Sequence, residues 1–223
     1  MIFFDLDDTL LDHESAARAG AKAFYEAYRF AFSEDEENFQ QRWNTVSEKY
    51  FQANNIAQYS FLEARRLRVR ELFSDPLTDV EAEARFDIYL KIYELNWKLY
   101  ADAMPCLLAL QGHKLGLITN GESETARLKI KKLGLDSCFW TVIISREVNC
   151  AKPDKAIFEL AAKQAGVNIS DCVYVGDRLE TDALSSHRAG MKGIWLDRKG
   201  KGIGKEFDVP VIKSLMELPK LLR

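Results

Sequence analysis

Short apolar runs alternate with longer amphipathic segments along the second half of the chain. The runs contain few polar positions, which is typical of parallel strands that are buried on both faces. Strands that alternate with helices predict a doubly wound parallel sheet, and therefore an α/β fold. One further apolar run, close to the N-terminus, adds a strand to this sheet. The predicted strands cover residues 2–6, 114–119, 140–145, 172–176 and 192–196.

Glycine and proline mark the helix ends in this half. Gly134, Gly166 and Gly190 each follow a helix-length segment, where a left-handed C-cap residue is expected. Pro153 falls at the expected first turn of another helix, a position that tolerates proline because the first turn needs no backbone N–H.

The segment from residue 14 to residue 101 has helical periodicity and no convincing buried strand. It predicts an all-α domain, inserted after the first strand, so that the sheet domain consists of residues 1–13 and 102–223. Most aromatic residues of the chain lie in the insert, and we interpret them mainly as its core. A few, such as Phe24, Tyr25 and Tyr28, could instead stack on a base or a sugar. The predicted helices cover residues 14–32, 36–54, 61–73 and 80–100.

Charge and composition narrow the classes of partner. The formal net charge is −3, whereas nucleic-acid-binding proteins usually carry a basic excess, so no nucleic acid is expected. One basic cluster is interpreted as the solvated face of a helix, with contact to substrate or partner as the alternative. Its members are Arg65, Arg66, Arg68 and Arg70.

Cysteine spacing and hydropathy bear on the compartment. The four cysteines form neither a metal knuckle nor a redox pair, so we expect buried thiols in a reducing compartment. No apolar run reaches the ~18 residues that a membrane-spanning helix needs, and no secretory leader is evident. A cytoplasmic monomer or homodimer is expected, with no membrane contact. The cysteines are Cys106, Cys138, Cys150 and Cys172.

Acidic residues crowd the end of the first predicted strand, where Asp5, Asp7 and Asp8 fall within four positions. Asp5 and Asp7 are two residues apart, so in an extended backbone both point to the same side. The carboxyl ends of parallel strands form the usual ligand crevice of such sheets. Carboxylates placed there can bind Mg²⁺, and one of them can attack phosphorus as a nucleophile. A turn or helix cap is the alternative, but a cap needs one acid rather than three.

Thr119, Asn120 and Gly121 close the strand at residues 114–119. Their hydroxyl, amide and backbone N–H groups at a helix start could hold phosphate oxygens. The same three residues also form ordinary turns, so this motif gains its meaning only from the others.

A lysine and two further acids follow the later strands. Lys152 could balance the charge of a nucleophile and of a transferring phosphoryl group, although a single lysine is more often solvated. Asp177 would face Asp5 across the sheet and complete a magnesium site. Asp182 could either support that site through its ligands or place favourable charge at a helix N-terminus.

Together these motifs resemble the haloacid dehalogenase-like (HAD) hydrolase superfamily over essentially the whole chain. The matching segments are FFDLDDTL, LITNG, AKPD and VGDRLETD. The helical insert resembles the type-one cap of subfamily I, a domain that closes over the crevice of the Rossmann-like core and holds most of the substrate specificity. Within subfamily I, the chain is most similar to the group of pyrimidine 5′-nucleotidases and N-acylneuraminate 9-phosphate phosphatases.

The resemblance implies a role for each residue. Asp5 would be the nucleophile and a magnesium ligand. Asp7 would be the general acid and base, with its backbone carbonyl on the metal. Thr119 and Lys152 would hold the phosphoryl oxygens, and Asp177 would complete the metal ligands. Because dehalogenase and phosphonatase members lack an acid at the position of Asp7, the resemblance favours a phosphate ester, which points to a small phosphorylated metabolite.

Two other functions are compatible with the sequence. A sugar phosphomutase would use the same pair of aspartates but would retain a bisphosphate intermediate. A non-catalytic binding protein on the same scaffold is the other alternative, although such proteins lose catalytic acids that this chain keeps.

Overall fold

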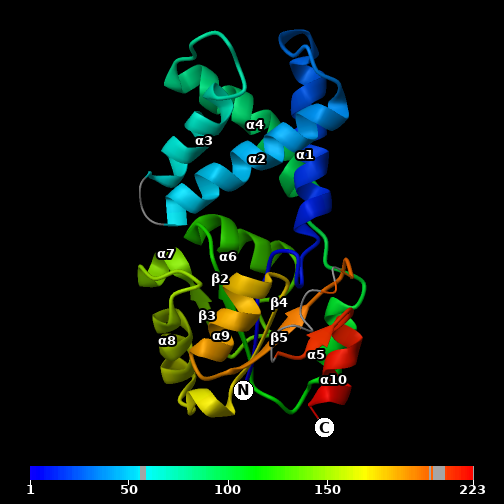
Figure 1. Ribbon diagram of the computed structural model, residues 1–223, viewed down its shortest axis with the longest axis vertical. Helices are drawn as coiled ribbons and strands as arrows, with labels where there is room; N and C mark the ends of the chain where they lie inside the picture. The colour runs from blue at the N-terminus through cyan, green and yellow to red at the C-terminus, as the bar shows by residue number, and fades with distance from the viewer. Residues whose placement is uncertain (56–58, 201, 203–208, 223) are drawn as a thin grey trace. The chain divides into compact units, whose positions relative to one another are not determined.

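The structure is a computed structural model that describes residues 1–55, 59–200, 202 and 209–222. The chain forms two compact units (Figure 1). The sheet unit combines Met1–Asp12 with Lys98–Arg223, and the helical unit is His13–Trp97. The helical unit therefore ends before residue 101, where the sequence analysis placed the boundary.

Backbone hydrogen bonds explain why residues 98–101 belong to the sheet unit. The N–H of Tyr100 donates to the carbonyl of Leu10 at 2.8 Å, and the N–H of Asp12 donates to the carbonyl of Lys98 at 3.0 Å. The two connecting segments are thus paired with each other. Their pairing satisfies backbone groups that a helix would otherwise satisfy internally.

The sheet unit is built on six parallel strands in the order β3-β2-β1-β4-β5-β6. Five of them overlap the predicted runs, which confirms the predicted α/β class. The sixth, β6, was missed because two residues give no readable periodicity. The strands are β1 (Ile2–Phe4), β2 (Leu115–Thr119), β3 (Thr141–Ile144), β4 (Val173–Gly176), β5 (Lys192–Leu196) and β6 (Val211–Ile212).

Both faces of the sheet are covered. Phe3 and Phe4 are successive residues of β1, so they point to opposite faces, yet both are fully buried. On one face, Phe3 packs with Phe158 of α8 and Tyr174 of β4. The α-helices of this unit are α5 (Ala103–Ala109), α6 (Ser123–Lys132), α7 (Ser145–Val148), α8 (Lys155–Ala165), α9 (Ser185–Arg188) and α10 (Leu218–Leu221).

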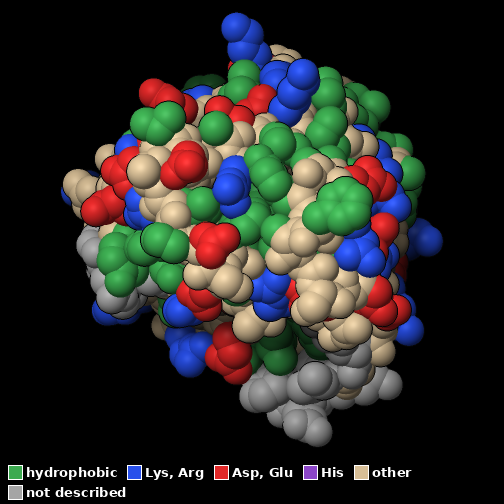
Figure 2. Space-filling model, turned by 90° about the horizontal axis from the view of Figure 1, so that it is seen from above, with side chains coloured by type: hydrophobic (Ala, Val, Ile, Leu, Met, Phe, Trp, Pro, Cys, Tyr) green, Lys and Arg blue, Asp and Glu red, His purple; other side chains and the backbone are tan. Residues whose placement is uncertain are grey.

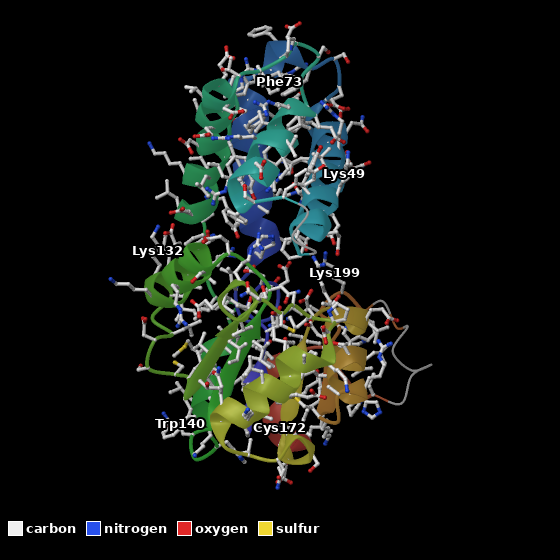
Figure 3. The ribbon with its side chains drawn as sticks, turned by 90° about the vertical axis from the view of Figure 1, so that its left-hand side faces the viewer. Lys49, Phe73, Lys132, Trp140, Cys172 and Lys199 are labelled. Atoms are coloured by element: carbon white, nitrogen blue, oxygen red, sulfur yellow. The ribbon has the colours of Figure 1, made fainter. Side chains whose placement is uncertain are left out.

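Shorter helical turns complete the sheet unit. They are η2 (Ile169–Asp171), η3 (Leu179–Leu184) and η5 (Leu215–Glu217). Figure 3 labels Trp140 and Cys172, which directly precede β3 and β4 and therefore mark the amino ends of the strands. Lys132, at the end of α6, lies toward the opposite edge of the unit in the same view.

The predicted helix start at Pro153 is wrong. The helix α8 begins at Lys155, and the side chain of its N-cap residue, Asp154, accepts a hydrogen bond from the N–H of Ala156. Pro153 precedes this cap and follows a cis peptide bond. At the other end the expectation is confirmed, because Gly166 caps α8 in the left-handed conformation with φ 69°.

The helical unit consists of four α-helices and one short turn within its described residues. Both α3 and α4 begin with capping boxes, in which Ser60 pairs with Glu63 and Thr78 pairs with Glu81. Phe24 and Tyr25 are buried in the aromatic core of this unit, which confirms their interpretation as core residues. The elements are α1 (His13–Ala27), η1 (Arg29–Ala31), α2 (Glu36–Asn55), α3 (Phe61–Arg70) and α4 (Asp79–Leu95).

The basic cluster of α3 is not a uniformly solvated face. Arg66 and Arg70 pair with Asp79, as expected for surface residues. Arg68, in contrast, lies over the rings of Trp43, Phe86 and Tyr89, and burial lowers the pKa of its guanidinium. The prediction is therefore wrong for Arg68, because its position on the helix turns it toward the aromatic core.

The charge pattern in Figure 2 is mixed: lysines and arginines are interspersed with acidic and apolar side chains, and neither sign forms an extended field on the face drawn. Among the described helices, none combines the length and apolarity that crossing a membrane requires. Cys106 and Cys172 are buried as expected, whereas Cys138 and Cys150 are half-buried, and all four are free thiols.

Gly193 permits the close approach of β5 to η3. A Cβ atom there would lie 2.0 Å from the carbonyl oxygen of Ala183 and 2.7 Å from Oγ of Ser186. We expect Gly193→Ala to destabilise the protein by about 2–4 kcal/mol, because backbone must shift to relieve the overlap. Thermal unfolding would show this as a lower midpoint. Gly121→Ala is the matched control, since open space surrounds that position; equal midpoints for the two variants would contradict the packing described.

Candidate active site

The predicted site residues converge because three neighbouring strands end at the same edge of the sheet. Asp5 follows β1, Thr119 is the last residue of β2 and Asp177 follows β4. In the sheet, β1 lies between β2 and β4, so these ends are adjacent. The backbone N–H of Asp5 also donates to the carbonyl of Val175 at 2.9 Å, which holds Asp5 against β4 beyond the end of the strand.

Lys152 is the centre of the site. Its ammonium donates hydrogen bonds of 2.7 Å to Oδ1 of Asp5, to Oδ1 of Asp182 and to the hydroxyl of Tyr174. The lysine is almost completely buried, and so are its three partners. Three acceptors match the three N–H bonds of an ammonium, so the head of this lysine is fully hydrogen-bonded.

Burial and charge oppose each other here. Burial favours the neutral amine of Lys152, but the carboxylates of Asp182 and Asp5 outweigh it and raise the pKa of the lysine. Burial raises the pKa of Asp5 to about 7, against the opposing effect of Lys152. Burial, together with the charges of Asp182 and Asp5, raises the pKa of Asp177 to about 8. Three carboxyl groups thus share one lysine, and Asp5 and Asp177 keep their protons up to about neutral pH unless a further cation compensates their charge.

A divalent cation fits this donor set. Carboxylate oxygens of Asp5, Asp177 and Asp182 lie within 4.8 Å of one another. Oxygen ligands of this kind suit a hard cation such as Mg²⁺. Asp182 is already engaged, because Oδ1 accepts from Lys152 and Oδ2 accepts from the backbone N–H of Arg178 at 3.0 Å. Asp5 and Asp177 are consequently the side chains best placed to bind a cation directly.

Asp182 comes this close because β4 ends in glycine. A Cβ atom on Gly176 would lie 2.4 Å from Cγ of Asp182. Asp182 is 1% exposed and lies in the first turn of η3, where a negative charge at a helix N-terminus was one of its two expected roles. Its carboxylate also contacts Lys152 and Tyr174.

Asp7 lies on the loop after β1 and pairs with a lysine that the sequence analysis did not single out. Nζ of Lys129 donates to Oδ1 of Asp7 at 2.7 Å and to Oδ2 at 2.8 Å. The loop itself is closed by the N–H groups of Leu10 and Leu11, which both donate to the carbonyl of Leu6 at 2.9 Å. Asp8 takes a positive φ of 58° within this turn.

The loop after β2 differs in part from its predicted use. The side chain of Asn120 was expected to hold phosphate, but it bonds the backbone of Lys152 at both ends, at 2.8 and 2.9 Å. The backbone N–H of Gly121 donates to Oγ of Ser145 at 3.0 Å. Thr119 is buried, and its hydroxyl lies 3.5 Å from the carbonyl of Asn120, a weak contact. Asn120 therefore positions the loop that carries Lys152. Of the three residues, Thr119 has the hydroxyl that remains the best candidate for a phosphate contact.

Sequence reasoning missed Tyr174, Lys129 and Ser145. Tyr174 is an inward residue of β4 whose hydroxyl donates to the carbonyl of Ile118 at 3.0 Å and also contacts Lys152. A tyrosine in a buried strand needs a hydrogen-bond partner, and this was the signal for it. For Lys129, the signal was a lysine at a buried position of an amphipathic helix. No sequence signal marks Ser145.

Three relatives match nearly the whole chain. A family model described as haloacid dehalogenase-like hydrolase matches residues 1–190. The glyceraldehyde 3-phosphate phosphatase of Methanopyrus kandleri is 32% identical over 90% of this chain and 84% of its own length. The pyrimidine 5′-nucleotidase YjjG of Escherichia coli is 30% identical over 99% and 96%. The human N-acylneuraminate-9-phosphatase is 29% identical over 100% and 93%.

The fold is similar to that of a solved structure from Bacillus subtilis. The HAD-hydrolase YfnB, crystallised with magnesium, superposes with a TM-score of 0.80 and 21% identity, covering 100% of this chain and 97% of its own. At this identity the likeness concerns the fold.

The raised pKa values of Asp5 and Asp177 predict how the metal-free protein responds to pH. Both acids have folded-state pKa values above 3.8, so folding favours their protonated forms, and this stability is lost as the pH rises through about 7 and 8. Without divalent cations, we expect the unfolding midpoint to fall between pH 5 and pH 8.5. A loss of ~2 kcal/mol would lower it by roughly 5 °C.

Thermal unfolding in buffers with a chelator measures this slope. Asp177→Asn should flatten it, because one of the two titrating acids is gone, and excess Mg²⁺ should raise the midpoint more at pH 8.5 than at pH 5. A metal-free midpoint that stays level or rises over this range would contradict the electrostatics described.

Proposed function

Because the chain belongs to the haloacid dehalogenase-like hydrolase family, we propose that it is a magnesium-dependent phosphatase that forms an aspartyl-phosphate on Asp5. The observation that carries this proposal is the pairing of two acids with separate lysines. Asp5 contacts Lys152, and Asp7 contacts Lys129. Two acids in different environments suit a nucleophile and a proton-transfer group.

Asp5 has the features of a nucleophile. Lys152 donates a hydrogen bond to Oδ1 of Asp5. Oδ2 is not part of this contact and is therefore the oxygen better placed to attack phosphorus. In the first step an oxygen of Asp5 attacks phosphorus, the bond from phosphorus to the leaving oxygen breaks, and that oxygen takes the proton of Asp7. The ammonium of Lys152, which contacts Asp5, would stabilise the negative charge that develops on the phosphoryl oxygens. The hydroxyl of Thr119 would donate to another of these oxygens.

Asp7 acts in both halves of the reaction. In the second step water attacks phosphorus, passes a proton to Asp7, and the bond to Asp5 breaks, which releases phosphate and restores both acids. A bound Mg²⁺, held by Asp5, Asp177 and the backbone carbonyl of Asp7, would neutralise charge on the phosphoryl group. The second acid also favours a phosphate ester over a carbon–halogen bond, since the alkoxide released from an ester needs a proton.

The substrate class follows only in outline from the relatives. Their names specify a triose phosphate, a pyrimidine nucleotide and a sugar acid phosphate. All three are small phosphorylated metabolites, and we propose that this chain acts on a compound of that class, such as a sugar phosphate or a nucleoside 5′-monophosphate. A phosphatase screen across such metabolites, followed by kcat/KM for the best substrates, tests the assignment.

Asp5→Asn should abolish turnover of p-nitrophenyl phosphate with Mg²⁺. The amide is a poor nucleophile, so we expect a loss of at least about 1,000-fold in kcat. Asp136→Asn is the matched control, because Asp136 is exposed and lies outside the site. Magnesium-dependent activity that survives Asp5→Asn, in enzyme purified away from host phosphatases, would overturn the mechanism.

A further inference from the structure

Lys129 occupies an unusual place for a lysine. The helix α6 buries Ala126, Lys129 and Ile130 on one side, the spacing of a core-facing stripe. Lys129 is 6% exposed, whereas the neighbouring Lys131 and Lys132 are exposed. Burying an ammonium is costly unless it is paired and hydrogen-bonded. The ion pair with Asp7 offsets part of the free energy that desolvating the ammonium of Lys129 costs.

The contact engages the whole carboxylate. Nζ of Lys129 lies 2.7 Å from Oδ1 and 2.8 Å from Oδ2 of Asp7. The side chain of Asp7 is 31% exposed, whereas that of Lys129 is 7% exposed. The buried lysine therefore contacts a carboxylate that solvent also reaches. Asp7 stands two residues from Asp5, and that neighbouring negative charge would favour other orientations of its carboxylate. An ammonium that is hydrogen-bonded to both oxygens restricts rotation of the Asp7 carboxylate.

We propose that Lys129 is a positioning residue that fixes the carboxylate of Asp7 for proton transfer, an inference that rests on the proposed function. The geometry of a proton-transfer group matters strongly, since a displacement of about 1 Å can cost roughly 100-fold in rate. Loss of Lys129 would therefore impair the steps that use Asp7 and spare a step that does not.

The two half-reactions separate these effects. p-Nitrophenolate is a weakly basic leaving group and departs without a proton, so the first step with p-nitrophenyl phosphate needs little help from Asp7. The second step needs Asp7 to accept a proton from water. With this substrate, Lys129→Met should slow hydrolysis of the aspartyl-phosphate more than its formation, so phosphoenzyme should accumulate. With an alkyl phosphate, the first step should slow as well.

The experiment measures rapid-quench kinetics with p-nitrophenyl phosphate and Mg²⁺. For Lys129→Met we expect a burst of p-nitrophenolate close to one per active site, followed by steady-state turnover about 10–100-fold slower than in the native protein. Lys129→Arg keeps a cation at this position and should restore most of the turnover. Lys131→Met, an exposed lysine on the same helix, is the matched control and should behave like the native protein.

Two results would overturn the role of Lys129: turnover of Lys129→Met equal to that of Lys131→Met, or slow turnover without accumulated phosphoenzyme. If Lys129→Met does not fold, as judged by thermal unfolding, Lys129→Gln is measured in its place against the same outcomes. Failure of the proposed function is distinguishable, because it would appear as native activity that survives Asp5→Asn, whatever the Lys129 variants do.

Discussion

The buried ammonium of Lys152 is the interaction on which the sheet edge depends. It joins Asp5 from the end of β1 to Asp182 from η3, and it contacts Tyr174 within β4. Two carboxylates this deeply buried would repel each other without a cation between them, and their desolvation would be uncompensated. Removing the lysine would therefore disturb the structure as well as any chemistry at this edge.

Neighbouring segments hold Lys152 in place. The side chain of Asn120 bonds both backbone groups of Lys152, so the loop after β2 fixes the loop that carries the lysine. Tyr174 connects the ammonium to the carbonyl of Ile118, again in β2. Once Asp5 and Asp177 ionise, one lysine does not neutralise them together with Asp182, which is the physical reason to expect that this site can bind a second cation.

The sequence predicted what depends on local pattern. Buried strands and the motifs at their ends were readable, because each is a contiguous run with its own periodicity or composition. The pairing of Lys129 with Asp7 was not readable, since 122 positions separate the two residues and lysines are usually solvated. Arg68 was misjudged for the same reason, because only the packed aromatic core shows that its face of α3 turns inward.

The central claim is that a carboxylate oxygen of Asp5 is the nucleophile that bonds to phosphorus, and that Asp5 and Asp177 together bind a cation. A crystal structure grown with Mg²⁺ and beryllium fluoride, a mimic of a phosphoryl group on aspartate, tests it most directly. The account predicts beryllium bonded to a carboxylate oxygen of Asp5, fluorine atoms near Lys152 and Thr119, and Mg²⁺ bound by Asp5 and Asp177. Beryllium fluoride bound to another residue, or Mg²⁺ bound away from these two acids, would contradict it.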